Sequence, residues 1–373
     1  MSMQKLGKGL AERGVPLPQD IFGEDGKLLL RQGHVITDQK LLDTLLKRGL
    51  YVDTAAAAAK AQEDLLGGHK YDPFWLWDEI IGKLGHLLRQ YDDEEDIPSH
   101  VAFLSRLVQM LNERSKDAAL AAMILLTDQS RYSLVHCLHA GLLCDMVATR
   151  LEWSEDRRRS LVCAALTMNI SMVDTQQKLA EQAEPLTPDQ RLDIKAHPKT
   201  SADILNRVGV EDSIWLQAVH DHHETPLGNG YPTGTKEIGE EATLLRTADV
   251  FSAKVSPRMN RKQMSGAQAA RVLFTDPGMT TANPFIAVLI KEVGIYPPGS
   301  FVKLATGETG IVYKRSGNAH TPVVLSLTNS RGTPEAKPIR RDTSREEFKI
   351  MSIVPRENIM IRINPIAIWG GSA

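Results

Sequence analysis

The sequence contains few cysteines: three in 373 residues. Cys137, Cys144 and Cys163 are odd in number, lie in apolar segments and include no Cys-x-x-Cys pair. This usage excludes a disulfide framework and a cysteine-rich zinc site. It is typical of reduced, buried thiols, and we therefore expect a cytoplasmic protein.

The chain also lacks a charge excess and a long hydrophobic run. Its 44 basic and 46 acidic residues give a net charge of −2, so no basic field favours nucleic acid or a membrane surface. The longest apolar run, residues 118–126, is far shorter than the roughly 20 residues of a membrane-spanning helix. No secretory signal opens the chain. We expect no nucleic-acid partner and no membrane contact.

The sequence pattern predicts four segments. Residues 1–53 are predicted to form a small module of strands and a helix, with Asp25-Gly26 as a hairpin turn. Residues 54–100 read as a helical linker region, and residues 101–293 as a helical domain, because apolar residues recur every three or four positions. Residues 294–373 are β-rich, with expected strands at 301–304, 310–313 and 322–327. The predicted fold class is mainly α, with a helical central domain between an α+β N-terminal module and a β-rich tail.

An aromatic and aliphatic stripe follows the linker. It recurs at helical spacing and consists of Phe74, Trp75, Trp77, Ile80, Ile81 and Leu84. Such a stripe favours packing over a cofactor site. The packing is either within the chain or between two copies, so a homodimer stays an open alternative.

The most informative motif is the run from His222 to Pro232. Two adjacent histidines and Glu224 precede a Gly-Asn-Gly-Tyr-Pro loop at residues 228–232. Imidazole is a ligand for iron, manganese and zinc, and glycine lets the backbone turn sharply and approach a ligand. The plain alternative is a helix end with solvated histidines followed by a turn.

This run closely resembles the HHE-x-x-D-G-x-G-Y-P signature of HD-GYP domains, with Leu227 at the position of the family's Asp. HD-GYP domains are metal-dependent phosphodiesterases that hydrolyse cyclic di-GMP, and the resemblance covers roughly residues 125–293. It implies metal ligands at His136, His197, His222, His223 and Asp249. It implies contacts to a ligand, or to a cyclic di-GMP synthase-type domain, from Gly228, Asn229, Gly230, Tyr231, Pro232, Arg258 and Arg261.

The His-Asp dyad that names the family is missing. Its two positions are Met168 and Asn169, and the family's nearby lysine is Met172. The dyad Asp of the family bridges two metals, whereas Asn is neutral and offers a single carbonyl oxygen. A thioether is a poor ligand for iron or manganese.

The remaining ligands are too few for two metals. Only His136 and Asp249 would be left for the first metal, while the three histidines at 197, 222 and 223 could hold the second. Some relatives bind a third metal through a Glu at the position of Tyr132. We therefore expect at most one divalent transition metal of iron or manganese type. The alternative is no metal, with the histidines hydrogen-bonded to each other and to Glu224.

The sequence thus predicts a degenerate HD-GYP-type protein of bacterial cyclic di-GMP signalling. It would bind cyclic di-GMP or a protein partner with little or no hydrolysis. The alternative is an active metal-dependent cyclic di-GMP phosphodiesterase with an atypical site. A third interpretation is a structural or dimerisation protein whose pocket holds nothing.

Overall fold

The structure is a computed structural model of the chain. It describes residues 3–5, 13, 15, 17, 21–23, 27–31, 33–41, 51–53, 65–259, 263–281 and 283–370. The chain divides into two compact units, Met1–Tyr71 and Asp72–Ala373. The four segments predicted from the sequence draw their boundaries differently and stay a prediction.

The N-terminal unit contains a small antiparallel sheet. Its strands are β1 (Met3–Lys5), β2 (Ile21–Phe22), β3 (Leu28–Leu30) and β4 (Tyr51–Asp53), in the order β1-β4-β2-β3. The pairing of β2 with β3 is the one the sequence predicts. The predicted Asp25-Gly26 turn lies outside the described residues.

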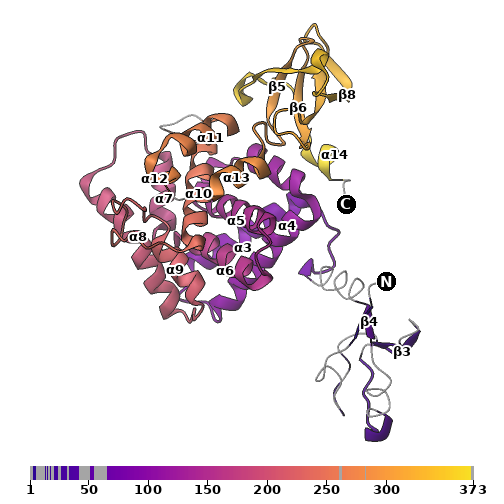
Figure 1. Ribbon diagram of the computed structural model, residues 1–373, viewed down its shortest axis with the longest axis vertical. Helices are drawn as coiled ribbons and strands as arrows, with labels where there is room; N and C mark the ends of the chain where they lie inside the picture. Colours follow the sequence, from indigo (N-terminus) through magenta and orange to yellow (C-terminus); the bar gives the residue numbers. More distant parts are fainter. Residues whose placement is uncertain are drawn as a thin grey trace. The chain divides into compact units, whose positions relative to one another are not determined.

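The second unit begins with a helical domain, whose helices form a bundle around α5 (Figure 1). Its helices are α3 (Pro73–Arg89), α4 (Ile97–Leu125), α5 (Tyr132–Arg150), α6 (Glu155–Thr167), α7 (Val173–Glu181), α8 (Pro188–Arg207), α9 (Ser213–Asp221), α10 (Glu240–Val255), α11 (Gly266–Thr275), α12 (Pro277–Thr280) and α13 (Phe285–Val293). Two short 3-10 turns, η1 (Gln129–Arg131) and η2 (Ile170–Met172), precede α5 and α7.

Helix α5 is the centre of this domain. It packs against α3, α4, α6, α10 and α13, and every residue from Tyr132 to Ala148 is buried. A helix that is covered on all sides carries apolar residues all round. Its few buried polar residues, His136 among them, therefore need partners from the surrounding helices.

The aromatic stripe lies in α3 and is part of the core. Phe74, Trp77, Ile80, Ile81 and Leu84 are all buried, and Asp72 caps the helix by accepting from the amides of Phe74 and Trp75. The predicted packing role is confirmed, and it is provided within one chain.

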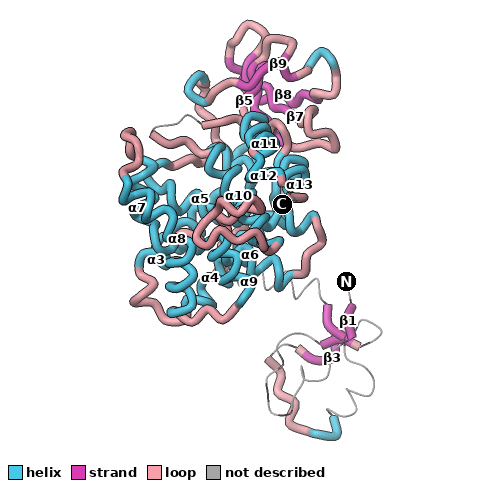
Figure 2. Tube along the Cα trace, turned by 60° about the vertical axis from the view of Figure 1, so that its left-hand side comes forward, coloured by secondary structure: helices cyan, strands magenta, loops and turns pink. Residues whose placement is uncertain are grey.

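A five-stranded antiparallel sheet follows, which Figure 2 shows as a separate layer of strands. Its strands are β5 (Phe301–Leu304), β6 (Thr309–Lys314), β7 (Val323–Thr328), β8 (Pro334–Asp342) and β9 (Ile350–Ile353), in the order β8-β7-β6-β5-β9. The first three are the predicted strands. The other two were not predicted because β8 is mostly exposed and charged and β9 is short.

The sheet is fastened to the helical domain by polar and aromatic contacts. The guanidinium of Arg315 donates to Asp117 of α4 over 2.6 Å. Helix α14 (Pro365–Trp369) places the Trp369 ring 6.2 Å from those of both Phe74 and Tyr313, measured between centroids. Among the described residues, no helix is both long and apolar enough to cross a membrane. The fold class is mainly α, as the sequence predicts.

We expect Trp369→Ala to lower the free energy of unfolding by roughly 3 kcal/mol or more, as truncation of a buried aromatic ring does. The Trp369 side chain is 2% exposed, and its indole N–H donates to the Tyr313 carbonyl over 2.9 Å. Urea unfolding measures the change. Met360→Ala is the control, because Met360 is 93% exposed. Equal midpoints for the two variants would show that Trp369 does not stabilise the unit.

Candidate functional site

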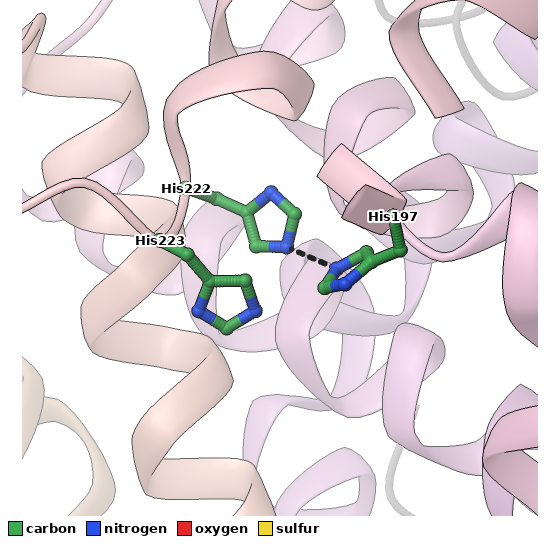
Figure 3. Close-up of side chains that lie close together, drawn as sticks. All are labelled: His197, His222 and His223. Carbon is green, nitrogen blue, oxygen red and sulfur yellow. Dashed lines mark hydrogen bonds between the residues drawn. The ribbon is translucent and has the colours of Figure 1, made fainter. Parts of the chain in front are cut away.

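Three of the predicted histidines converge at one point. His197 comes from α8, while His222 and His223 directly follow α9. One ring nitrogen of each lies within 4.8 Å of the others. Figure 3 shows the rings turned toward a common centre. His197 and His222 are buried and His223 is half-buried.

Local backbone geometry fixes the orientation of two of these rings. Nδ1 of His197 lies 2.6 Å from the carbonyl oxygen of Ile194, and Nδ1 of His222 lies 2.6 Å from that of Val219. Pro198 has no N–H, so the Ile194 carbonyl lacks its usual helical donor. Val219 lies in the last turn of α9, where carbonyls also lack helical donors. Each carbonyl therefore accepts from a histidine instead.

This arrangement decides the tautomers. A carbonyl oxygen only accepts, so Nδ1 carries the hydrogen on His197 and on His222. The two Nε2 atoms then present lone pairs to each other over 3.1 Å. Burial, and after it the neighbouring His222, lower the pKa of His197 to about 3, and burial also lowers the pKa of His222. At neutral pH neither ring supplies a proton for the contact.

Two facing lone pairs at this distance fit a metal ion. Imidazole nitrogens bind transition metals at about 2.0–2.1 Å, which separates two such nitrogens by about 2.9–3.3 Å for angles between square and tetrahedral. The observed 3.1 Å falls inside that interval. Backbone carbonyls that hold the other ring nitrogen are the usual support of a metal-binding histidine. The donor set of His197, His222 and His223 therefore fits a single divalent ion.

The other two predicted ligands bind each other. Nε2 of His136 donates to Oδ1 of Asp249 over 2.7 Å, which joins α5 to α10. Burial alone would raise the pKa of Asp249, but the hydrogen bond and charge of His136 hold it below its usual range. The Ser252 hydroxyl lies 3.1 Å from Nδ1 of the same histidine. Both ring nitrogens of His136 thus have protein partners, unlike those of the histidine triad.

The residues predicted to occupy the dyad positions lie beside this pair. Met168 directly follows α6, Asn169 precedes η2, and both are buried. Burial and the charge of Asp249 raise the pKa of the Cys137 thiol to about 12, whereas a hydrogen bond with Asn169 lowers it. Asn169 therefore contacts the residue next to His136. Met172, at the position predicted for the family's lysine, is also buried, and its side chain carries no ammonium group.

Tyr132 and Arg258 form a stack over His136. The Tyr132 ring lies parallel to the imidazole, with 5.7 Å between centroids and 8° between planes. Arg258 donates to the Tyr132 hydroxyl over 2.7 Å, and its guanidinium lies 4.7 Å from the ring centroid. The predicted role of Arg258 in ligand contact thus competes with a bond inside the protein. Arg261 lies outside the described residues.

The Gly-Asn-Gly-Tyr-Pro loop is tied to Glu224. One carboxylate oxygen of this buried residue accepts from the Thr233 amide, the Thr233 hydroxyl and the Gly234 amide, over 2.6, 2.8 and 3.0 Å. Glu224 therefore anchors the loop and does not bond to the histidines, contrary to the metal-free alternative from the sequence. Tyr231 stacks on His223, with 4.7 Å between centroids and 27° between planes. The loop thus forms one wall of the histidine site.

A cavity of about 400 Å³ is lined in part by this loop and by His223. His223 and Tyr231 line it together with Leu227, Arg246 and Asp276. Reasoning from the sequence missed Arg246 and Asp276. Each is a single charged residue on a predicted helix or loop, and no motif distinguishes it from other surface charges.

Comparison with known proteins agrees with this geometry. The HD domain family matches residues 103–277. This part of the helical domain is similar to HD domains. Over 216 residues the chain is 27% identical to the cyclic di-GMP phosphodiesterase PA4108 of Pseudomonas aeruginosa, which covers 57% of this chain and 52% of that protein.

Two further proteins are similar. The 3'3'-cGAMP-specific phosphodiesterase 3 of Vibrio cholerae is 25% identical over 171 residues, which covers 45% of this chain and 37% of that protein. The chain therefore spans about half the length of the curated relatives it matches, or less. Bd1817, an HDG"Y"P protein from Bdellovibrio bacteriovorus, has a solved structure with a TM-score of 0.49 and 16% identity, covering 77% of this chain and 98% of that one.

We expect Gly230→Ala to displace the loop and to destabilise the domain. A Cβ at this position would lie 2.5 Å from the Glu224 Cα and 2.6 Å from the His223 carbonyl oxygen, both backbone atoms. Such overpacking costs roughly 1–3 kcal/mol, which thermal or urea unfolding can measure. In Gly317→Ala, the control, the added methyl meets no atom within 4 Å. A Gly230→Ala protein as stable as this control would contradict the close approach.

Proposed function

We propose that this HD domain binds a cyclic dinucleotide of the cyclic di-GMP class at a single-metal site and acts as a regulator with little or no hydrolysis. One observation carries the proposal. The lone pairs of His197 and His222 face each other beside a dyad position that holds Met168 and Asn169. The site keeps three histidines that would bind one metal, and the ligands expected for a second metal are incomplete.

His197, His222 and His223 would hold the ion, which is of iron or manganese type. When bound, it would supply a Lewis acid that polarises a phosphoryl oxygen. The protein residues orient the rings, exclude water from two of them and place the Gly-Tyr-Pro loop beside the third. The named activities of the two curated relatives support a cyclic dinucleotide as the ligand.

Efficient hydrolysis is disfavoured by what surrounds Asn169. Its neutral amide cannot hold two ions as a carboxylate does, and the adjacent His136 and Asp249 are already bonded to each other. Met172 removes a cation that would face a phosphate. Each loss would remove several kcal/mol of transition-state stabilisation, where every ~1.4 kcal/mol is tenfold in rate.

The second candidate is an active phosphodiesterase with one metal. The intact triad and the names of the relatives favour it. A protein partner is a further part of the proposal, because Glu224 anchors the end of the half-buried Gly-Asn-Gly-Tyr-Pro loop through Thr233 and Gly234, and Asn229 of this loop is exposed. A cyclic di-GMP synthase-type domain is the partner that the resemblance to HD-GYP domains suggests.

We expect the purified protein to bind about one divalent transition metal ion per chain, because three imidazoles and no complete second set are available. His222→Ala should abolish binding. His220→Ala should not, because the His220 ring bonds to Asp221 over 2.7 Å and stands outside the triad. Elemental analysis of the three proteins measures this. Two tightly held ions per chain, or a metal content unaffected by His222→Ala, would refute the single-metal site.

We expect turnover of cyclic di-GMP by the metal-loaded protein to stay below about 1 per second, the lower end of ordinary enzymes. Product formation followed by chromatography, with chelator-treated protein as the control, measures it. Faster turnover that disappears with the chelator would establish the phosphodiesterase alternative and overturn the regulatory function. Absence of cyclic di-GMP binding would overturn both.

A further inference from the structure

Arg246 is a half-buried cation without a partner in the described part of the chain. It lies in α10, three residues before Asp249 and on the same side of the helix. Its Nε atom is buried and has no hydrogen-bond acceptor. No ion pair joins its guanidinium to a carboxylate of the described residues. Leaving such a group unpaired costs free energy, which a ligand with acceptor atoms would recover.

The cavity beside the Gly-Tyr-Pro loop is where this cation is exposed. Its volume of about 400 Å³ is in the range of small-molecule sites. Asp276 stands at its exposed rim and also lines it. A Cβ built on Gly278 would lie 3.7 Å from an Arg246 Nη and 3.2 Å from the Asp276 Oδ1, so both charges flank the same corner. They are not bonded to each other, which leaves a gap between donor and acceptor.

One Asp276 oxygen is already used. Oδ1 accepts from the Gly278 amide over 2.8 Å and caps α12. The second carboxylate oxygen has no hydrogen-bond partner among the described residues. The corner therefore offers a guanidinium with several donors, one carboxylate acceptor, and beside them the stacked rings of Tyr231 and His223.

We propose that Arg246 and Asp276 form a guanine-binding subsite. The inference deepens the proposed function and depends on it. Arginine donates to O6 and N7 of guanine, while the free oxygen of Asp276 would accept from the N1 and N2 hydrogens. The aromatic wall is a surface of the kind on which nucleic-acid bases stack. His223 lines this cavity and also belongs to the triad. One nucleotide would therefore place its phosphate at the triad and its base in the cavity.

Other ligand groups fit this corner less well. Adenine carries an amino donor where guanine has O6, and it has no N2 amine. It would turn an amino donor toward Arg246 and leave only N7 as an acceptor for the guanidinium, and polar sites discriminate strongly against a ligand that lacks an expected hydrogen-bonding group. An isolated phosphate would pair with Arg246 but would be repelled by the Asp276 carboxylate.

The test compares cyclic di-GMP with cyclic di-AMP by titration calorimetry on the full chain. Wild type should bind cyclic di-GMP more tightly, and Arg246→Met should weaken cyclic di-GMP binding roughly tenfold to a hundredfold while cyclic di-AMP binding changes little. Asp276→Asn keeps the cap on Gly278 and should weaken cyclic di-GMP binding about tenfold. Arg207→Met is the matched control, because Arg207 is an exposed arginine paired with Asp92.

The outcomes separate the subsite from the function. Cyclic di-GMP binding that is unaffected by Arg246→Met would overturn the guanine subsite and leave the proposed function standing. If wild type binds neither cyclic dinucleotide, GMP and AMP are titrated next. A preference for GMP that Arg246→Met removes would support the subsite without the proposed function, and no such preference would overturn both. Unchanged unfolding midpoints and metal content in the variants exclude misfolding as the cause.

Discussion

The site depends on two backbone carbonyl oxygens whose helical donors are missing. Pro198 has no N–H to offer the Ile194 carbonyl, and the end of α9 leaves the Val219 carbonyl free. Each oxygen binds Nδ1 of a histidine and thereby turns Nε2 toward the other ring. The 3.1 Å contact between those nitrogens is unfavourable without a cation between them. The missing helical donors therefore orient the nitrogens of the proposed metal site.

The two halves of the centre differ in how their polar groups are satisfied. His136 and Asp249 are each other's partners, and Ser252 and Tyr132 complete their surroundings. A metal there would first have to break the bond between them, with only Asn169 to add as a ligand. The triad has no such internal bond to lose. This asymmetry, more than any one substitution, supports the proposal of binding without efficient hydrolysis.

The surrounding helices hold most of these groups in buried positions. Helix α5 is buried from Tyr132 to Ala148 and supplies His136. The hydroxyl of Ser171 in η2 bonds to that of Ser201 and donates to the His197 carbonyl, which joins η2 to α8. Glu224 fastens the loop that carries Tyr231. The C-terminal sheet is attached at α4 through Arg315 and does not line the cavity.

The sequence by itself determined the elements whose pattern is local. The apolar periodicity of α3, α4 and α5 and the strands β5 to β7 were predicted correctly, as were the burial of the cysteines and the convergence of the three histidines. The exposed, charged strand β8 was not, because its pairing with β7 and not its own pattern makes it a strand. Only the tertiary structure decided that Glu224 anchors the loop, that Arg258 bonds to Tyr132, and that Arg246 and Asp276 line one corner of a cavity. Each of these depends on residues brought together from separate elements, and no spacing along the chain records which acceptor a buried donor finds.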